Sequence, residues 1–214
     1  MSNPIYVFED GTPLKNKKKI YSWILEKNRN SKIIDTEKLC KKFGASFFEN
    51  IDRDYILVAI GQGGKMVLNY LKKYHYVSNE VYEISCERKF ENEEMIGYQI
   101  DNEQLNLLPV NSTVILFEDA IDSGGTINFV TNEILKRNSK VVRICSIFNI
   151  STFKSEKLKV LYQSELFDTN NLFSTRHLIF GEKGKNFHSK MFDNFFDNDI
   201  KFEQLLHEEL ENVN

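Results

Sequence analysis

Residues 114–126 read VILFEDAIDSGGT, and this stretch decides the fold and the chemistry that the sequence predicts. The four apolar residues at its start are typical of a strand buried on both faces, as in a parallel sheet. Glu118 and Asp119 follow directly, and two adjacent carboxylates there are costly unless they are exposed or bind a ligand. They can accept hydrogen bonds from vicinal hydroxyls, as in a ribose, or hold a hydrated divalent cation. The sequence therefore predicts a polar binding site where this strand ends.

The second half of the stretch, residues 122–126, predicts the start of a helix that binds an anion. It combines two hydroxyl residues with Gly124 and Gly125, which allow a ligand to approach the backbone closely. Backbone N–H groups at such a helix start form a cradle for a phosphomonoester. An ordinary N-capped helix explains Asp122 or Ser123 but not the whole run. One loop thus combines two carboxylates that can bind a diol with a helix start that can bind a phosphate. Ribose 5-phosphate carries both of these groups.

A second glycine-rich segment follows an earlier predicted strand. Residues 55–60 are a continuous apolar run, residues 61–65 read GQGGK, and helical spacing begins at Met66. Only 10 glycines occur in 214 residues, so a cluster of them at the end of a strand is informative. The segment also fits part of a GxGxxG dinucleotide loop, but Met66 stands where the third glycine belongs, and no Walker A motif is present.

Strands and helices alternate along the chain. Strand-length apolar runs at 55–60, 81–85, 114–117 and 141–147 are separated by segments with helical spacing. This order predicts an α/β fold with a mostly parallel twisted sheet flanked by helices. Ligands bind such sheets at the carboxyl ends of the strands, where both glycine-rich segments fall.

The chain is expected to have three segments. Residues 1–50 form an N-terminal helical segment, with helices from Leu14 to about Asn28 and from Asp35 or Thr36 onward. Residues 51–150 form the α/β core, and residues 151–214 form a C-terminal extension. The extension holds a strand at 158–161 and a terminal amphipathic helix marked by Phe202, Leu205, Leu206 and Leu210.

The composition is that of a soluble globular protein. With 28 Lys and Arg against 31 Asp and Glu, the net charge is −3, which gives no electrostatic argument for binding nucleic acid or an anionic membrane. No apolar run approaches the ~20 residues that span a bilayer, and the N-terminus lacks a signal-peptide pattern. Cys40, Cys86 and Cys145 show neither disulfide nor metal-site spacing. We therefore expect a cytoplasmic protein without nucleic-acid or membrane partners.

The stretch VILFEDAIDSGGT resembles the 5-phosphoribosyl-1-pyrophosphate (PRPP) signature of type I phosphoribosyltransferases along its whole length. The resemblance implies a type I phosphoribosyltransferase-like core with a variable hood from the termini. It implies that Glu118 and Asp119 bind the ribose hydroxyls, directly or through magnesium-bound water, and that Asp122 assists deprotonation of the acceptor. The 5-phosphate would be held by Ser123, Gly124, Gly125 and Thr126. The Glu-Asp-x-Ile-Asp-Ser-Gly form is most similar to the 6-oxopurine branch.

Two further segments stand where the family places its other functional loops. A flexible catalytic loop is expected after the strand at 81–85, at residues 87–97. Its Arg88 and Lys89 resemble the basic pair of orotate-type members, which neutralises charge on the departing pyrophosphate. The same loop carries four glutamates, and a solvated surface loop is the alternative for it. The pyrophosphate itself would be bound by Gly61, Gln62, Gly63, Gly64 and Lys65.

The reaction implied is Mg²⁺-dependent transfer of 5-phosphoribose from PRPP to a nitrogenous base, a purine by preference, with release of pyrophosphate, as in nucleotide salvage. The hood pattern of the 6-oxopurine enzymes has no convincing copy in residues 151–190. The acceptor is therefore open between a purine, a pyrimidine and a compound that is not a free nucleobase.

Two other functions compete with this one. The first is a non-catalytic module of the same fold that senses PRPP or a nucleotide and acts through a protein partner. The second is a nicotinamide-dinucleotide module that uses Gly61–Gly64. We expect a homodimer, or a protein partner bound through the C-terminal region. Phenylalanines are frequent at 167–196 and serve either that contact, acceptor stacking or ordinary core packing.

Overall fold

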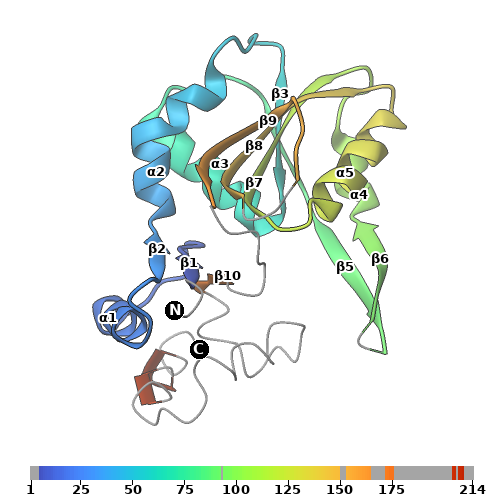
Figure 1. Ribbon diagram of the computed structural model, residues 1–214. Coiled ribbons are helices and arrows are strands. Elements are labelled where there is room, and N and C mark those ends of the chain that lie inside the picture. Colours follow the sequence, from blue (N-terminus) through green and yellow to red (C-terminus); the bar gives the residue numbers. More distant parts are fainter. Residues whose placement is uncertain are drawn as a thin grey trace. The chain divides into compact units, whose positions relative to one another are not determined.

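The computed structural model describes residues 5–92, 94–149, 153–164, 172–175, 204–205 and 207–209. The chain divides into two compact units, drawn together in Figure 1. One unit is formed by residues 1–35 with 168–214, and the other by residues 36–167. Within the described ranges, no helix has the length and apolar character needed to cross a membrane.

The unit of residues 36–167 is built on a five-stranded sheet in the spatial order β4-β3-β7-β8-β9, and every neighbouring pair is parallel (Figure 1). This confirms the mostly parallel α/β fold that the sequence predicts. The strands are β3 (Ile56–Ile60), β4 (Val81–Ile84), β7 (Thr113–Ile121), β8 (Lys140–Asn149) and β9 (Leu158–Gln163).

Alternate side chains of the central strands supply two hydrophobic clusters, one on each face of the sheet. In β3, Val58 belongs to one cluster and its neighbour Leu57 to the other; in β7, Leu116 and Phe117 divide in the same way. All four are fully buried.

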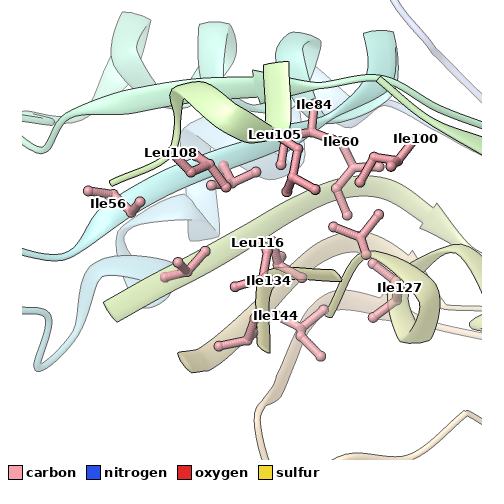
Figure 2. Packing of buried hydrophobic residues seen from close by; sticks show 14 of the residues in the cluster. Ile56, Ile60, Ile84, Ile100, Leu105, Leu108, Leu116, Ile127, Ile134 and Ile144 are labelled. Atoms are coloured by element: carbon pink, nitrogen blue, oxygen red, sulfur yellow. The ribbon is translucent and has the colours of Figure 1, made fainter. Parts of the chain in front are cut away.

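Helices cover both faces of the sheet. On one face, α3 (Gly61–Tyr74) and α2 (Thr36–Phe43) pack on Leu57 and Phe117, followed by a 3₁₀ helix at Gly44–Phe48. On the other face lie α4 (Asn102–Leu107) and α5 (Gly125–Leu135), whose Leu105, Ile127 and Ile134 meet the strands in Figure 2. The compact unit begins at Thr36, and Cys40 and Phe47 are buried in the same cluster as Leu57.

The strand order reverses between β3 and β7. From β3 the chain passes through α3 to β4 on one side, whereas β7 pairs on the other side of β3 and leads through α5 to β8. In open α/β sheets, ligands bind in the crevice at such a switch point. The first residues of α3 and α5 both stand at this crevice.

A β-hairpin stands where the sequence predicts a flexible loop at 87–97. β5 (Cys86–Glu91) and β6 (Glu94–Ile100) pair antiparallel, with Arg88 opposite Tyr98. Figure 1 shows the hairpin projecting beyond the sheet. Most of its side chains are exposed, so it lacks the alternation of apolar and polar residues by which strands are recognised in a sequence.

The base of the hairpin is fixed by hydrogen bonds to the start of α4. The N–H of Ser85 donates to Oε1 of Gln104 at 2.6 Å, and the N–H of Asp101 donates to the carbonyl of Ser85 at 2.9 Å. The carboxylate of Asp101 caps α4 by accepting from the N–H groups of Glu103 and Gln104.

The other unit holds a parallel sheet of three short strands in the order β10-β1-β2. They are β1 (Tyr6–Phe8), β2 (Lys32–Ile34) and β10 (Leu172–Ser174). The helix α1 (Lys17–Lys27) packs Ile20 and Ile24 with Phe173 in one buried cluster. Phe173 is thus a core residue, and the other phenylalanines of 167–196 lie outside the described residues, as do Phe202, Leu206 and Leu210.

Candidate functional site

A cavity of about 250 Å³ lies at the crevice where β3 and β7 end. Its wall is formed by the first residues of α3, the hairpin strand β5, the end of β7 and the loop that leads into α5. Of the residues that the sequence analysis singles out, those that line it are Gly61, Gln62, Gly63, Arg88, Glu118, Asp122, Ser123, Gly124, Gly125 and Thr126.

Glu118 and Asp119 interact through their side chains at the end of β7. Glu118 lines the cavity, whereas the Asp119 carboxylate lies against Gly63 of α3, where any Cβ would overlap it. Oδ1 of Asp119 accepts from the N–H of Ala120 at 2.7 Å. Burial, together with the neighbouring charge of Asp119, raises the pKa of Glu118 well above its ordinary value. The two carboxylates therefore repel each other when both are ionised, and Glu118 is the one that lines the cavity.

The loop from β7 into α5 presents its backbone to the cavity. Gly124 adopts the left-handed conformation, with φ 78°, and the ring of Phe153 covers it. No described side chain caps the start of α5, and the N–H of Gly125 makes only a 3.4 Å contact with Oγ of Ser123. The first N–H groups of a helix have no partner within the helix, so those of α5 are open to an anion.

The segment 61–65, read as a loop in the sequence, is the first turn of α3. The helix begins at Gly61, whose φ is 56°, again without a described side chain as cap. Gly64 packs on β7, where a Cβ would overlap the carbonyl oxygen of Phe117. Lys65 extends toward Glu83, with 2.9 Å between Nζ and Oε2. Gly64 and Lys65 thus stand outside the cavity lining, and their part in ligand binding stays a prediction.

The hairpin brings one of its two predicted basic residues to the cavity. Nη2 of Arg88 lies 3.6 Å from Oδ2 of Asp122. Lys89, the next residue along β5, faces the other side of the ribbon, is exposed and does not line the cavity. Cys86 also lines the cavity, and burial followed by the charge of Glu118 raises the pKa of its thiol to about 11.

The electrostatics of the cavity suit a ligand with two anionic groups. The N-termini of α3 and α5 both carry partial positive charge and both reach the same cavity. Glu118 adds a hydrogen-bond acceptor for hydroxyl groups. Arg88 and Asp122 add one cation and one further carboxylate at the wall, so the site can neutralise an anionic leaving group and accept a proton.

The donor set fits a hydrated cation and not a metal held by the protein alone. Across the described residues, no group of three or more His, Cys, Asp or Glu is placed to hold a metal ion. Mg²⁺ usually keeps several waters and uses one or two carboxylates together with substrate phosphates. Glu118 and Asp119 meet that requirement, because a cation beside them would relieve the repulsion that raises the pKa of Glu118.

Three residues around the site escape prediction from sequence. They are Cys86, Tyr98, whose hydroxyl lies against Gly125, and Phe153, whose ring covers Gly124. Tyr98 could be found only after residues 86–100 were recognised as a hairpin, because the pairing with Arg88 sets the face on which it lies. No local pattern marks Phe153, which follows β8 in an irregular segment.

Comparison with known proteins gives one family and a set of similar folds. A model of the phosphoribosyl transferase domain matches residues 24–175, a range that includes the whole cavity. A hypothetical protein from Neisseria gonorrhoeae with bound ppGpp has a similar structure, with a TM-score of 0.50 and 12% identity over 84% of this chain and 93% of that one. This likeness shows the fold. A comparison with curated proteins finds no match.

Two further solved structures have lower scores. A hypoxanthine phosphoribosyltransferase from Staphylococcus aureus has a TM-score of 0.46 and 16% identity, covering 60% of this chain and 72% of that one. A purine phosphoribosyltransferase from Pyrococcus horikoshii has a TM-score of 0.47 and 12% identity, covering 65% and 87%.

Proposed function

The chain belongs to the phosphoribosyl transferase domain family and is an enzyme of the phosphoribosyltransferase type, and on that premise we propose that it transfers 5-phosphoribose from PRPP to a purine-type base, with Mg²⁺ and with release of pyrophosphate. The nitrogen of the base forms a bond to the anomeric carbon of the ribose, while the bond from that carbon to the pyrophosphate oxygen breaks.

One observation carries the proposal: two helices without a described side-chain cap, α3 and α5, begin at one cavity. PRPP carries a phosphate on one end of its ribose and a diphosphate on the other. It therefore offers an anionic group to each helix N-terminus and vicinal hydroxyls to the carboxylates at the end of β7.

The donor is assigned to the site in three parts. The 5-phosphate lies at the start of α5, on Ser123, Gly124, Gly125 and Thr126. The ribose hydroxyls lie at Glu118 and Asp119. The pyrophosphate lies at the start of α3, on Gly61, Gln62 and Gly63, with Gly64 behind them. Lys65 would join it by leaving Glu83, which is easy because an exposed ion pair contributes little.

Asp122, Arg88 and Lys89 are assigned to the chemical step. Asp122 would take the proton from the acceptor nitrogen, since its carboxylate reaches the cavity wall. Arg88 would neutralise the charge that develops on the departing pyrophosphate. Lys89 is the second cation of the pair and, from its exposed face of β5, would serve only after a movement of the ribbon.

Bound Mg²⁺ would supply charge neutralisation for the diphosphate and the ribose oxygens. Glu118 and Asp119 would hold it through water, as the fit described above allows. These two residues also orient the ribose, which fixes the anomeric carbon relative to Asp122.

The purine-type acceptor is the finer part of the proposal. Its support is the Glu-Asp-x-Ile-Asp-Ser-Gly form of residues 118–124, which is most similar to the 6-oxopurine branch of the family. A homodimer and a cytoplasmic setting are further expectations from the sequence and stay predictions.

The test is pyrophosphate release from PRPP and Mg²⁺ with a panel of hypoxanthine, guanine, xanthine, adenine, uracil and orotate. We expect turnover with at least one 6-oxopurine and its loss in excess EDTA. Turnover with a pyrimidine alone would refute the purine assignment and leave phosphoribosyl transfer in place. No turnover with any base, together with absence of PRPP binding in calorimetry, would refute both.

A second candidate is a sensor that binds PRPP or a nucleotide without catalysis. It is favoured by the N. gonorrhoeae protein of similar fold, whose structure holds ppGpp. Thermal stabilisation by PRPP or ppGpp without turnover on any base would favour the sensor. Turnover that ppGpp does not inhibit would count against it.

A further inference from the structure

The hairpin β5–β6 meets the proposed phosphate loop through one aromatic residue. Arg88 and Tyr98 stand directly opposite each other in the ribbon, so their side chains share one face. On that face Arg88 reaches Asp122, and Tyr98 reaches the first turn of α5. The two side chains therefore approach consecutive parts of the same loop.

Tyr98 makes two contacts with α5. Its ring stacks on Phe129, with 5.5 Å between ring centroids and 24° between planes. Its hydroxyl lies against Gly125, where a Cβ would overlap it. Gly125 does not adopt the left-handed conformation that favours glycine. Glycine is therefore needed at this position to admit Tyr98 and not to satisfy the backbone.

The rest of the hairpin has fewer means of attachment. Its base is tied by the hydrogen bonds of Ser85 with Gln104 and Asp101. Its tip exposes Phe90, Met95 and Ile96, with 42%, 45% and 60% of their surface accessible. The contact of Tyr98 with Gly125 and Phe129 lies between these ends, at the level of Arg88.

We propose that Tyr98 is a positioning residue: it latches the hairpin onto the start of α5 through Gly125 and Phe129, and thereby places Arg88 at Asp122. The part of this inference that concerns Arg88 in catalysis rests on the proposed function. The latch itself does not, because it is a property of the ligand-free protein.

The first test is hydrogen exchange of the hairpin amides in the donor-free protein. Loss of an aromatic stack in Tyr98→Ala should speed exchange of residues 87–99 about threefold to tenfold. Gln99→Ala changes the next residue, which is exposed on the other face, and should leave exchange unchanged. Equal exchange in the wild type and Tyr98→Ala would overturn the latch.

The second test is the pairing of Tyr98 with Gly125. Gly125→Ala should speed hairpin exchange as Tyr98→Ala does, because its methyl group displaces the hydroxyl. In the Tyr98→Ala background the same change should add nothing. Additive effects in the double variant would refute the contact. If Tyr98→Ala does not fold, Phe129→Leu removes the stack from the other side and gives the same readout.

Kinetics then separate positioning from simple stability. Tyr98→Ala should lower kcat and leave the KM of PRPP within about threefold, while Tyr98→Phe, which keeps the stack, should restore kcat. If Tyr98→Ala speeds hydrogen exchange of the hairpin but the wild type shows no turnover, the contact of Tyr98 with α5 is supported and the proposed function is refuted. If Tyr98→Ala keeps full turnover and the hydrogen exchange of its hairpin is unchanged, the positioning role of Tyr98 is refuted and the proposed function is supported.

Discussion

Arg88 of the hairpin and Asp122 of the loop before α5 form an ion pair at the cavity wall, with 3.6 Å between Nη2 and Oδ2. Their side chains are 35% and 30% exposed, so water screens the pair and it contributes little to stability. A pair of this kind can open when a substrate arrives. Among the described residues that line the cavity, Arg88 is the one cation, and the pair brings it to the carboxylate proposed to accept the proton.

The first prediction concerns the two basic residues of β5. Arg88→Ala should lower kcat about 10²-fold, as loss of a charge-stabilising group in a transition state does. Lys89→Ala should have a smaller effect, because that side chain faces the other side of the ribbon. Steady-state kinetics on both variants check this. An equal loss in Lys89→Ala would show that the ribbon moves or turns during turnover.

The second prediction concerns the acids that end β7. Glu118→Gln combined with Asp119→Asn should abolish PRPP binding in calorimetry with Mg²⁺, because the ribose and the hydrated cation lose their acceptors. Glu133→Gln, which changes an acid of α5 paired with Lys136, is the matched control and should bind normally. Unchanged PRPP affinity in the double variant would refute the assignment.

The third prediction compares two glycines of α3. Gly64→Ala should lower the free energy of unfolding by about 1–3 kcal/mol, because its methyl group has to displace the backbone of β7 at Phe117. Gly61 has open space around it, so Gly61→Ala should cost only the strain of its left-handed backbone, about 1–2 kcal/mol. Urea unfolding measures both. PRPP affinity should fall more in Gly61→Ala, since Gly61 lines the cavity.

The fourth prediction concerns the unit formed by the chain termini. The buried carboxylate of Glu209 accepts hydrogen bonds from the N–H groups of Lys15, at 2.8 Å, and Asn16, just before α1. Glu209→Gln should cost about 1–3 kcal/mol. Unfolding of this unit can be followed by fluorescence of Trp23, the single tryptophan, which lies in α1. The exposed Glu208 accepts a hydrogen bond from the side chain of Asn16 and gives the control Glu208→Gln, with little loss expected.

The fifth prediction concerns the thiols. Because the pKa of Cys86 is raised to about 11, its thiolate is scarce at pH 8 and alkylation should be roughly 10²-fold slower than for a free thiol. The rate should rise with pH up to about 11. Cys40 and Cys145 are fully buried and should stay unlabelled in the folded protein. Cys86→Ser should remove the reaction; residual labelling at the same rate would contradict it.

The raised thiol pKa also fixes the sign of a stability effect. Cys86 holds its proton more tightly in the folded protein than in the unfolded chain, so its contribution is fully present below the ordinary pKa of 9.0. It is lost as the pH rises from there toward about 11. In urea unfolding at pH 8 and pH 10.5, the free energy of unfolding should fall with rising pH by more in the wild type than in Cys86→Ser.

The sheet and the start of α5 could be predicted because their signals are local. The apolar runs of β3 and β7 are continuous, since these strands are buried on both faces. Residues 122–126 carry the hydroxyls and glycines that predict the start of α5. In both cases neighbouring residues in the chain contain the whole argument.

The hairpin and the short strands β2 and β10 could not be predicted in this way. Strand β5 is stabilised by pairing with β6. Its side chains are mostly polar and exposed, so they lack the alternation of apolar and polar residues that marks a strand in a sequence. Strands β2 and β10 have three residues each and are stabilised by pairing with β1. β2 lies near β1 in the sequence, whereas β10 comes from the C-terminal part of the chain. The hydrogen bonds that Glu209 accepts come from the N–H groups of Lys15 and Asn16, which lie far from it in the chain.

The sequence by itself determined the α/β sheet and the helix start after β7, with the polar residues that stand there. Tertiary structure alone decided that Arg88 and not Lys89 reaches the cavity, that the Asp119 carboxylate lies against Gly63, and that Gly125 is covered by Tyr98. The physical reason is the range of the interactions. Burial patterns and helix starts depend on residues that are consecutive in the chain. Which side chain of β5 faces the cavity, and which side chain packs on Gly125, depend on contacts between distant parts of the chain.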